Sequence, residues 1–543
     1  MEITEATLQA VPGILDPSQD DYHETEADRP GPVGDPGNSP GVRTAQQPSA
    51  RGCVFRYGTF TADPETGVLT CSYSLDEREF TERVTLAAGP RWLSAQARAA
   101  ARLVFLLAGV SYYKTAAPPV IDLGDTVLTG AELAFLREFY LQGLGEFAYR
   151  NALDLAPLRI EATRAAEPWP SADPVPFSPR MPAASQAPAA HQAPAGSEAP
   201  AGSEAPAGSE APTGSGAPAA SGAPAALHAP AAARPRRVLV PFGGGIDSIV
   251  TAEQVRPRAD AALFVVSRPA DRFAAIEEPA AVTGLPVVRA EREIDPQLLR
   301  SAELGFLNGH VPVTGILSAI AILAAVLDDR DAVVMSNEWS ASVPTLHHHG
   351  HPVNHQYSKS EDFEAAFRGV LAASPAPLPD YFSWLRDRTE LWVGEQFAAL
   401  GRYHASFRSC NKAFFTERTR RLDYWCGQCD KCCFIDLILA PFLSAAALRR
   451  IFSVTGEPLG RPALGGKFRA LLGAGAKPFE CVGEVTECRA AALLAARRDD
   501  RAGDALLQEL AAEVAAWPDA PSAADAAAML RPVGRNFVSA RYR

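Results

Sequence analysis

Apolar and polar positions follow two different periods in the first part of the chain. Short runs rich in β-branched and aromatic residues, Cys53–Phe60 and Val68–Leu75, flank the turn-forming sequence Asp-Pro-Glu-Thr-Gly and predict a β-hairpin. A further strand is expected at Phe80–Leu86. Apolar residues then recur every three or four positions over Ser94–Leu107 and Thr129–Asn151, which predicts helices. This part of the chain is therefore predicted to be a small α+β domain.

The pattern changes in the second half, where short apolar runs alternate with helical periods. Buried strands are expected at Arg237–Pro241, Ala261–Val266 and Ala332–Ser336, and a helix at Val313–Leu327. Strands that alternate with helices are typical of a parallel sheet with helices on both faces. Beyond Phe434 the sequence is rich in Ala and Leu and predicts a mostly helical region.

Two stretches show neither period. Residues 1–51 are rich in Asp, Glu, Pro, Gly and Gln, and we expect a disordered leader. Residues 167–234 are mostly Ala, Pro, Gly and Ser, with too few large apolar side chains to offset the entropy of ordering, so we expect a flexible linker. The predicted order is the leader, the α+β domain at 52–166, the linker, an α/β domain at 235–443 and a helical region at 444–543.

Composition and charge argue against several classes of protein. The chain of 543 residues has 51 Lys and Arg against 63 Asp and Glu, and its formal charge of -12 argues against a nucleic-acid partner. Neither a signal peptide nor a membrane-spanning apolar run is visible, and nine cysteines are too few for a disulfide scaffold. We therefore expect a cytoplasmic protein without a membrane partner, whose oligomeric state the sequence does not predict.

A strand that runs into three glycines carries the strongest chemical signal. Gly243, Gly244 and Gly245 let the backbone approach an anion, and the helix opening at Asp247 and Ser248 adds its partial positive charge. The spacing matches neither a Walker loop nor the dinucleotide fingerprint. It resembles the pyrophosphate loop (PP-loop) Ser-Gly-Gly-x-Asp-Ser of adenylating HUP-type ATPases, with Gly243 in place of Ser. The resemblance implies that these five residues bind ATP, Asp247 through Mg²⁺; a ligand-free glycine turn is the alternative.

Cysteines gather at a spacing suited to one metal ion. Cys426, Cys429 and Cys432 lie in Cys-Gly-Gln-Cys-Asp-Lys-Cys-Cys, and Cys410 upstream can supply a fourth thiolate. Four thiolates favour structural Zn²⁺, with an iron–sulfur cluster or unligated thiols as alternatives. Either Cys432 or Cys433 can be the third ligand of this motif, and the spacing favours Cys432. The pattern resembles the zinc knuckle of 7-cyano-7-deazaguanine synthases, which carry the same phosphate loop.

Other polar residues follow predicted strands or crowd into short segments. Asn337 and Glu338 come directly after a strand, at an edge where parallel sheets bind ligands, or else cap a helix. The segment Asn354–Ser360 is dense in side chains that bind oxyanions or move protons, or else it is a solvated loop. Glu480 and Cys481 form a further polar pair, for which ordinary packing of a small thiol is the favoured interpretation.

Four motifs together resemble one bacterial family. They are Pro-Phe-Gly-Gly-Gly-Ile-Asp-Ser, Ser-Asn-Glu-Trp-Ser, Val-Asn-His-Gln-Tyr-Ser-Lys-Ser and Trp-Cys-Gly-Gln-Cys-Asp-Lys-Cys-Cys-Phe. They look like the UDP-N-acetylmuramoyl-L-alanyl-L-glutamate epimerase family of peptidoglycan synthesis, over roughly residues 53–167 and 236–542. The resemblance implies a HUP-type fold with a zinc-knuckle-like cysteine cluster, and an isomerase that adenylates a UDP-linked muramoyl dipeptide with ATP and Mg²⁺.

The implied reaction inverts the terminal L-Glu to D-Glu and releases AMP and pyrophosphate. It needs a base at Cα, for which Lys359, His355 and Cys481 are equal candidates. The alternative function is another PP-loop adenylating enzyme, such as a deazaguanine synthase-like protein or an amide-forming ligase. The N-terminal region argues against the synthase, which would not need it.

Overall fold

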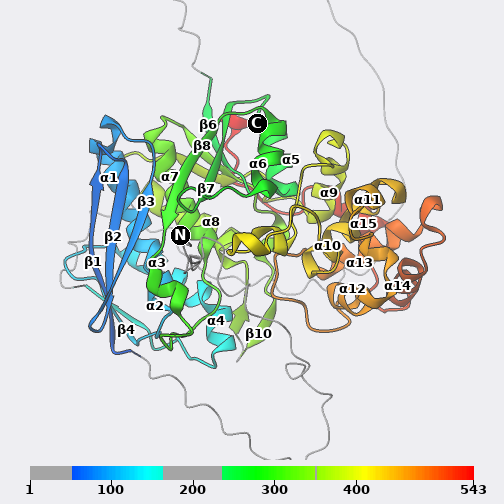
Figure 1. The fold of residues 1–543 in the computed structure, drawn as a ribbon, viewed down its shortest axis with the longest axis horizontal. Helices are drawn as coiled ribbons and strands as arrows, with labels where there is room; N and C mark the ends of the chain where they lie inside the picture. The colour runs from blue at the N-terminus through cyan, green and yellow to red at the C-terminus, as the bar shows by residue number, and fades with distance from the viewer. Residues whose placement is uncertain (1–51, 163–234, 349–350) are drawn as a thin grey trace, which may run out of the picture. The chain divides into compact units, whose positions relative to one another are not determined.

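The computed structural model describes residues 52–162, 235–348 and 351–543. Their main sheet has ten strands in the order β12-β9-β6-β7-β8-β3-β2-β1-β4-β5 (Figure 1). The predicted disordered leader and flexible linker lie outside the described residues. The fold is α/β, with one large sheet that is mostly parallel.

The parallel half of the sheet follows the predicted strand–helix alternation. Its strands are β6 (Arg237–Pro241), β7 (Asp260–Ser267), β8 (Val287–Glu293), β9 (Ala332–Met335) and β12 (Asp380–Ser383). Neighbouring strands in this half run parallel. The chain runs outward from β6 through β7 to β8, then returns to β9 on the other side of β6. The strand order therefore reverses between β6 and β9, which is where open α/β sheets bind ligands.

Helices cover both faces of this half. They are α5 (Ile246–Val255), α6 (Ala274–Thr283), α7 (Val313–Leu327) and α8 (Glu361–Ala372). Successive side chains of β7 join two different hydrophobic cores, one that includes α7 and one that includes α5 and α6. Side chains alternate between the faces of a strand, so a strand buried on both sides reads as a continuous apolar run.

The antiparallel half comes from the N-terminal region. The predicted hairpin is confirmed as β1 (Val54–Asp63) and β2 (Val68–Leu75), followed by β3 (Arg78–Thr85). β3 pairs antiparallel with β8, while β4 (Val120–Asp122) and β5 (Arg159–Glu161) extend the other edge in parallel. The parallel pairing predicted for the second half is thus confirmed, but the N-terminal strands continue the same sheet and make the whole sheet mixed. Periodicity indicates a strand but not its distant partner. In Figure 1 the blue strands lie beside the green ones.

A buried ion pair accompanies the junction of the two halves. Arg292 of β8 donates to Glu82 of β3 at 2.8 and 3.0 Å, and both residues are at most 3% exposed. The hydroxyl of Tyr112 also donates to Glu82, at 3.0 Å. Breaking such a pair would leave a buried charge unpaired, so it resists separation of the two halves.

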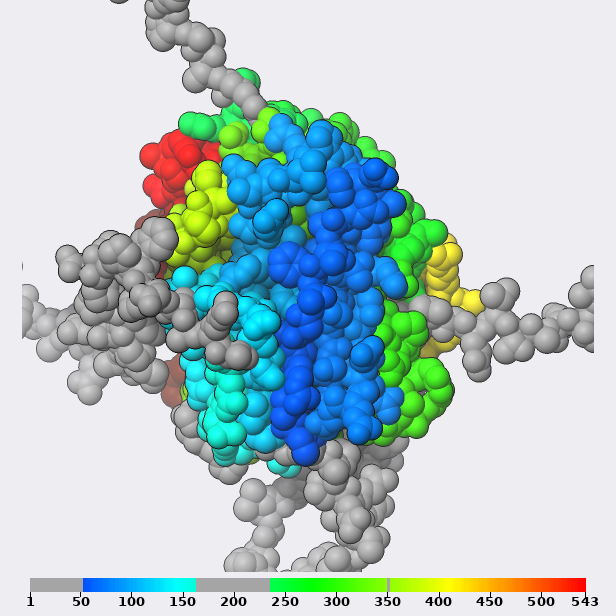
Figure 2. Space-filling view, turned by 90° about the vertical axis from the view of Figure 1, so that its left-hand side faces the viewer, coloured from blue at the N-terminus to red at the C-terminus, as the bar shows by residue number. Residues whose placement is uncertain are grey.

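Helices of the N-terminal region pack beside the parallel half. They are α1 (Ala95–Ala108), α2 (Val110–Tyr113), α3 (Gly130–Gly143) and α4 (Gly145–Arg150), and α1 packs against α7. The long helix predicted up to Asn151 is interrupted between α3 and α4. A Cβ at Gly143 would lie 2.6 Å from the Pro312 ring, so the chain approaches its neighbour closely at the break. In Figure 2 blue and cyan atoms form most of this side of the molecule.

The C-terminal region is helical, as predicted. After α9 (Glu390–Ala398) and α10 (Asp430–Leu439), the remaining α-helices are α11 (Ala445–Ile451), α12 (Gly465–Leu471), α13 (Val485–Ala496), α14 (Ala505–Ala515) and α15 (Ala523–Met529). A separate small hairpin pairs β10 (Leu346–His348) with β11 (His351–Val353). Among the described residues, none of the helices combines the length and apolar character needed to cross a bilayer.

Candidate functional site

The predicted phosphate loop connects β6 to α5. Gly244 has φ +76°, and a Cβ there would lie 2.1 Å from the carbonyl oxygen of Ala275. A Cβ at Gly243 would meet nothing within 4 Å, so the loop is open on that side. The Ser248 hydroxyl donates to the Gly245 carbonyl at 3.0 Å and so stabilises the turn. The first amides of α5 lack partners within the helix and suit an anion.

Substitution at Gly244 tests whether the loop geometry depends on glycine. We expect Gly244→Ala to destabilise the fold by about 2 kcal/mol or more, because it combines a left-handed φ with a backbone clash. Gly243→Ala is the matched control and should leave the melting temperature unchanged. Thermal unfolding of both variants measures the difference; equal melting temperatures would contradict the loop geometry.

Three carboxylates converge beside this loop. Oxygen atoms of Asp247, Glu338 and Glu390 all lie within 4.8 Å of one another. Asp247 opens α5 and Glu338 follows β9, so both lie where the strand order reverses. The Glu338 side chain makes no helix-capping hydrogen bond, which removes the alternative interpretation of that residue. Asn337 beside it is also buried, and its backbone N–H donates to the Ser383 hydroxyl at 3.1 Å.

The electrostatics of this carboxylate cluster fit a cation. Burial and the charge of Asp247 raise the pKa of Glu338 to about 7, and burial with both neighbours raises the pKa of Glu390 well above its usual value. One oxygen each of Asp247 and Glu390 is buried without a hydrogen-bond partner among the described residues. Carboxylates that repel one another and have oxygen atoms without hydrogen-bond partners are suitable ligands for a hard divalent cation.

Cys481 brings the three predicted base candidates together. Lys359 Nζ lies 3.1 Å from Cys481 Sγ, and His355 lies near enough to lower the pKa of the same thiol. Burial opposes ionisation of the thiol, but Lys359 and His355 outweigh it and hold the pKa of Cys481 well below its usual range. Burial likewise opposes a charge on His355, yet Cys481 and Glu146 raise its pKa to about 10. The arrangement therefore favours a thiolate between two cations.

Residues of the N-terminal region position the side chain of His355. The Glu146 carboxylate of α4 is hydrogen-bonded to His355 Nδ1, and the ring of His310 lies 4.2 Å from that of His355. Lys114 holds the segment before His310, since its Nζ donates to Asn308 Oδ1 and to the Gly309 carbonyl, both at 2.9 Å. A carboxylate behind a histidine fixes the orientation of the ring.

The thiol group and the carboxylate cluster are neighbours. Lys431 of α10 donates to the Cys481 carbonyl, and the charges of Lys431 and Lys359 both act on Asp247, opposing the rise in its pKa that burial causes. Asp247, Lys359 and Cys481 remain partly exposed, whereas Glu338, Glu390 and His355 are buried. The phosphate loop, the carboxylates and the thiolate thus form one polar site.

Four cysteines form the predicted metal cluster. The sulfur atoms of Cys410, Cys426, Cys429 and Cys432 all lie within 4.8 Å of one another, and Cys433 is not among them. Backbone amides of Cys426 and Cys429 point at sulfur atoms of the cluster, each at 3.4 Å. Thiolates gathered in this way, with amide donors behind them, could hold a metal ion.

A carboxyl next to the site makes stability depend on pH. Burial raises the pKa of Glu487 to about 8. An unfolded glutamate ionises near pH 4.3, so stability should fall as pH rises from there to about 8. Glu487→Gln should raise the melting temperature at about pH 8 and change it little at about pH 4. Glu303→Gln, with its side chain 66% exposed, is the control; equal effects of both substitutions at both pH values would contradict the pKa shift.

The sequence did not single out several residues of the site. Glu146, His310, Glu390 and Lys431 were missed because each lies in an ordinary helical or loop context. Lys431 alone carried a signal, since it lies between two of the predicted metal-binding cysteines.

Comparison with known proteins adds independent findings. The profile described as MurL N-terminal domain matches residues 46–182 and 213–384, and the MurL C-terminal domain profile matches residues 406–525. A Salinispora tropica protein is 35% identical over 90% of this chain and 94% of its own length. Proteins of Xanthomonas oryzae pv. oryzae and a Micromonospora species are 35% and 34% identical, over 85% and 82% of this chain and 90% and 87% of their own. All three are named UDP-N-acetyl-alpha-D-muramoyl-L-alanyl-L-glutamate epimerase. No solved structure matches.

Proposed function

Because the chain belongs to the UDP-N-acetyl-alpha-D-muramoyl-L-alanyl-L-glutamate epimerase family, we propose that it inverts the terminal L-Glu of that UDP-linked dipeptide to D-Glu. The observation that carries the proposal is the convergence of three parts at one edge of the sheet: a phosphate loop, a carboxylate cluster and a thiolate between two cations. Peptidoglycan precursor synthesis is the setting that the substrate implies.

The chemistry explains why an epimerase would need a nucleotide. The Cα proton beside an ionised carboxylate is very weakly acidic, because its removal places a second negative charge next to the first. Transfer of AMP from ATP to the α-carboxylate oxygen, with release of pyrophosphate, cancels that charge. The proton then becomes removable by a side chain, and reprotonation on the other face followed by hydrolysis gives D-Glu and AMP.

The loop and the carboxylates are suited to ATP. In this proposal Gly243, Gly244 and Gly245 place backbone amides against the phosphates, and Asp247 and Glu338 hold Mg²⁺, which would shield the phosphate charge. The reversal of strand order between β6 and β9 supports a HUP-type assignment, because ligands bind at such a reversal.

Cys481 is the proposed base. Its sulfur atom is in contact with Lys359, and the charges of Lys359 and His355 both favour the thiolate. Atoms about 3 Å apart cannot serve opposite faces of one carbon, so Cys481 and Lys359 act on a single face of Cα. Glu146 acts through His355 as a positioning residue.

We assign structural Zn²⁺ to the cysteine cluster. Tetrahedral sets of four thiolates favour this ion, and the cluster joins the segment after α9 to the start of α10, where Lys431 lies. When bound, the ion would fix these segments against each other, and it takes no part in the reaction.

Substitution of two adjacent cysteines tests this assignment. Cys432→Ser should lose the bound zinc and lower the melting temperature, because three thiolates bind the ion far more weakly. Cys433→Ser, one residue away and outside the cluster, should retain about one zinc per chain. Elemental analysis of both purified variants gives the answer; equal metal content would contradict the ligand set.

The function itself is tested with the purified protein. The protein is incubated with UDP-N-acetylmuramoyl-L-alanyl-L-glutamate, and the configuration of the terminal glutamate is then determined. D-Glu should form only when ATP is present. No conversion in its presence would overturn the proposal. The sequence left open a deazaguanine synthase-like enzyme or an amide-forming ligase, which would leave the stereochemistry unchanged.

A further inference from the structure

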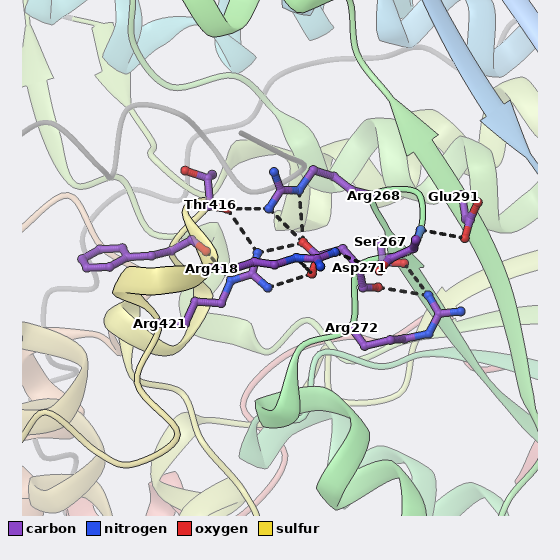
Figure 3. A network of polar contacts seen from close by, with 10 residues as sticks. Ser267, Arg268, Asp271, Arg272, Glu291, Thr416, Arg418 and Arg421 are labelled. Atoms are coloured by element: carbon purple, nitrogen blue, oxygen red, sulfur yellow. Dashed lines mark hydrogen bonds and ion pairs between the residues drawn. The ribbon is translucent and has the colours of Figure 1, made fainter. Parts of the chain in front are cut away.

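A group of arginines surrounds one buried carboxylate beside the site. Arg268, Arg418 and Arg421 all pair with Asp271, at 2.8, 3.1 and 2.8 Å (Figure 3). Arg421 binds both oxygens of that carboxylate. Burial opposes its charge, but Arg421 and its neighbours outweigh burial and lower the pKa of Asp271 to about 2. Asp271 therefore stays ionised and draws three guanidinium groups into one place.

The group contains more arginines than carboxylates. The labelled residues of Figure 3 comprise four arginines against two carboxylates, Asp271 and Glu291. The nearby Arg420 lies 4.0 Å from Glu417, so that pair adds no net charge. Of the three arginines that pair with Asp271, Arg418 is the most exposed, with its side chain 62% exposed. An ion pair that only stabilised the fold would need one arginine, whereas a surplus of guanidinium groups suits a phosphate ligand.

The position of the group connects it with both parts of the site. Arg268 and Asp271 directly follow β7, the parallel neighbour of β6, and α6 after them touches Gly244 of the phosphate loop. The segment that carries Arg418 and Arg421 begins near Asn411, which donates to Glu480 at 2.8 Å, next to Cys481. The two segments that carry the arginines therefore adjoin the phosphate loop and the neighbourhood of Cys481, respectively.

We propose that Arg268, Arg418 and Arg421 bind the diphosphate of a uridine nucleotide, which is the UDP end of the substrate. The inference rests on the proposed function. The amides of the phosphate loop and the first turn of α5 provide for the phosphates of ATP, so a separate cationic group serves the second nucleotide. A diphosphate diester is dianionic and accepts paired N–H donors, as guanidinium groups provide.

Substitution of the most exposed arginine tests this with little risk to folding. UDP alone is the probe, titrated calorimetrically into the full chain, and the KM values for the UDP-linked dipeptide and for ATP are measured separately. Arg418→Glu should raise the Kd for UDP and the KM for the dipeptide at least about tenfold, with the KM for ATP and kcat nearly unchanged. Arg418→Lys should restore part of the affinity. Arg300 is an exposed arginine that pairs with Glu303 outside the site, so Arg300→Ala should change neither the Kd for UDP nor the KM for the dipeptide.

Each other outcome overturns the inference. Unchanged constants for UDP and the dipeptide in Arg418→Glu would make the network purely structural, and a raised KM for ATP alone would assign the arginines to ATP. Failure of the proposed function is distinguishable, because UDP titration needs no turnover. If the chain bound UDP through Arg418 but inverted no glutamate, the inference would stand while the proposed function fell.

Discussion

Asp247→Asn is expected to lower kcat by about a thousandfold, because it removes a carboxylate that would hold Mg²⁺ against the phosphates of ATP. The same substitution should raise the melting temperature of the ligand-free protein. Burial and the neighbouring carboxylates disfavour an ionised Asp247, Glu338 and Glu390 together, and a neutral amide relieves their repulsion. A variant that is more stable and nearly inactive is the signature of a ligand-binding cluster rather than a structural one.

The control for this prediction lies in the same sheet. Asp260 is the first residue of β7, at the end of the strand away from the site, and its side chain is 51% exposed. Asp260→Asn should leave kcat and the KM for ATP unchanged, since exposed ion pairs contribute little. Steady-state kinetics and thermal unfolding of both variants provide the measurements. A loss of activity below about tenfold in Asp247→Asn would contradict the role assigned to the carboxylates.

Cys481→Ser is expected to abolish inversion while sparing the first chemical step. A serine hydroxyl keeps the shape of the side chain but stays protonated beside Lys359, so proton removal should slow by about a thousandfold. Exchange of labelled pyrophosphate into ATP in the presence of the dipeptide should continue, because adenylation does not use the thiol. Loss of inversion with continued pyrophosphate exchange would show that the thiol acts in proton removal and not in nucleotide binding.

Cys488→Ser is the matched control for the thiol. Cys488 is buried in α13, and burial raises the pKa of its thiol, in contrast to that of Cys481. The folded protein should retain its kcat after this substitution. If Cys481→Ser lost pyrophosphate exchange together with inversion, the thiol would belong to adenylation or to folding, and the assignment as base would be wrong.

Local signals in the sequence predicted the parts of the site that are close in sequence. The glycine loop and the three cysteines Cys426, Cys429 and Cys432 each lie within a few consecutive residues, so their geometry follows from one turn and one helix start, whereas Cys410 lies 16 positions before Cys426. The strands β6, β7 and β9 were predicted for the same reason, because each shows its own apolar run, whereas the short strand β12 was not predicted.

Contacts between distant segments could not be predicted from periodicity. The pairing of β3 with β8 joins residues separated by about two hundred positions, and it adds the N-terminal strands to the predicted parallel sheet. The same limit applies to Cys481, whose contacts with His355 and Lys359 come from another part of the chain. Glu146 was missed because its partner His355 lies 209 positions away in the sequence.

The most direct test of the account follows the reaction in D₂O with ATP and UDP-N-acetylmuramoyl-L-alanyl-L-glutamate. We expect solvent deuterium at Cα of the D-Glu product, and AMP with pyrophosphate as the nucleotide products. Formation of ADP, or inversion that proceeds equally well without ATP, would contradict activation of the carboxylate at the phosphate loop.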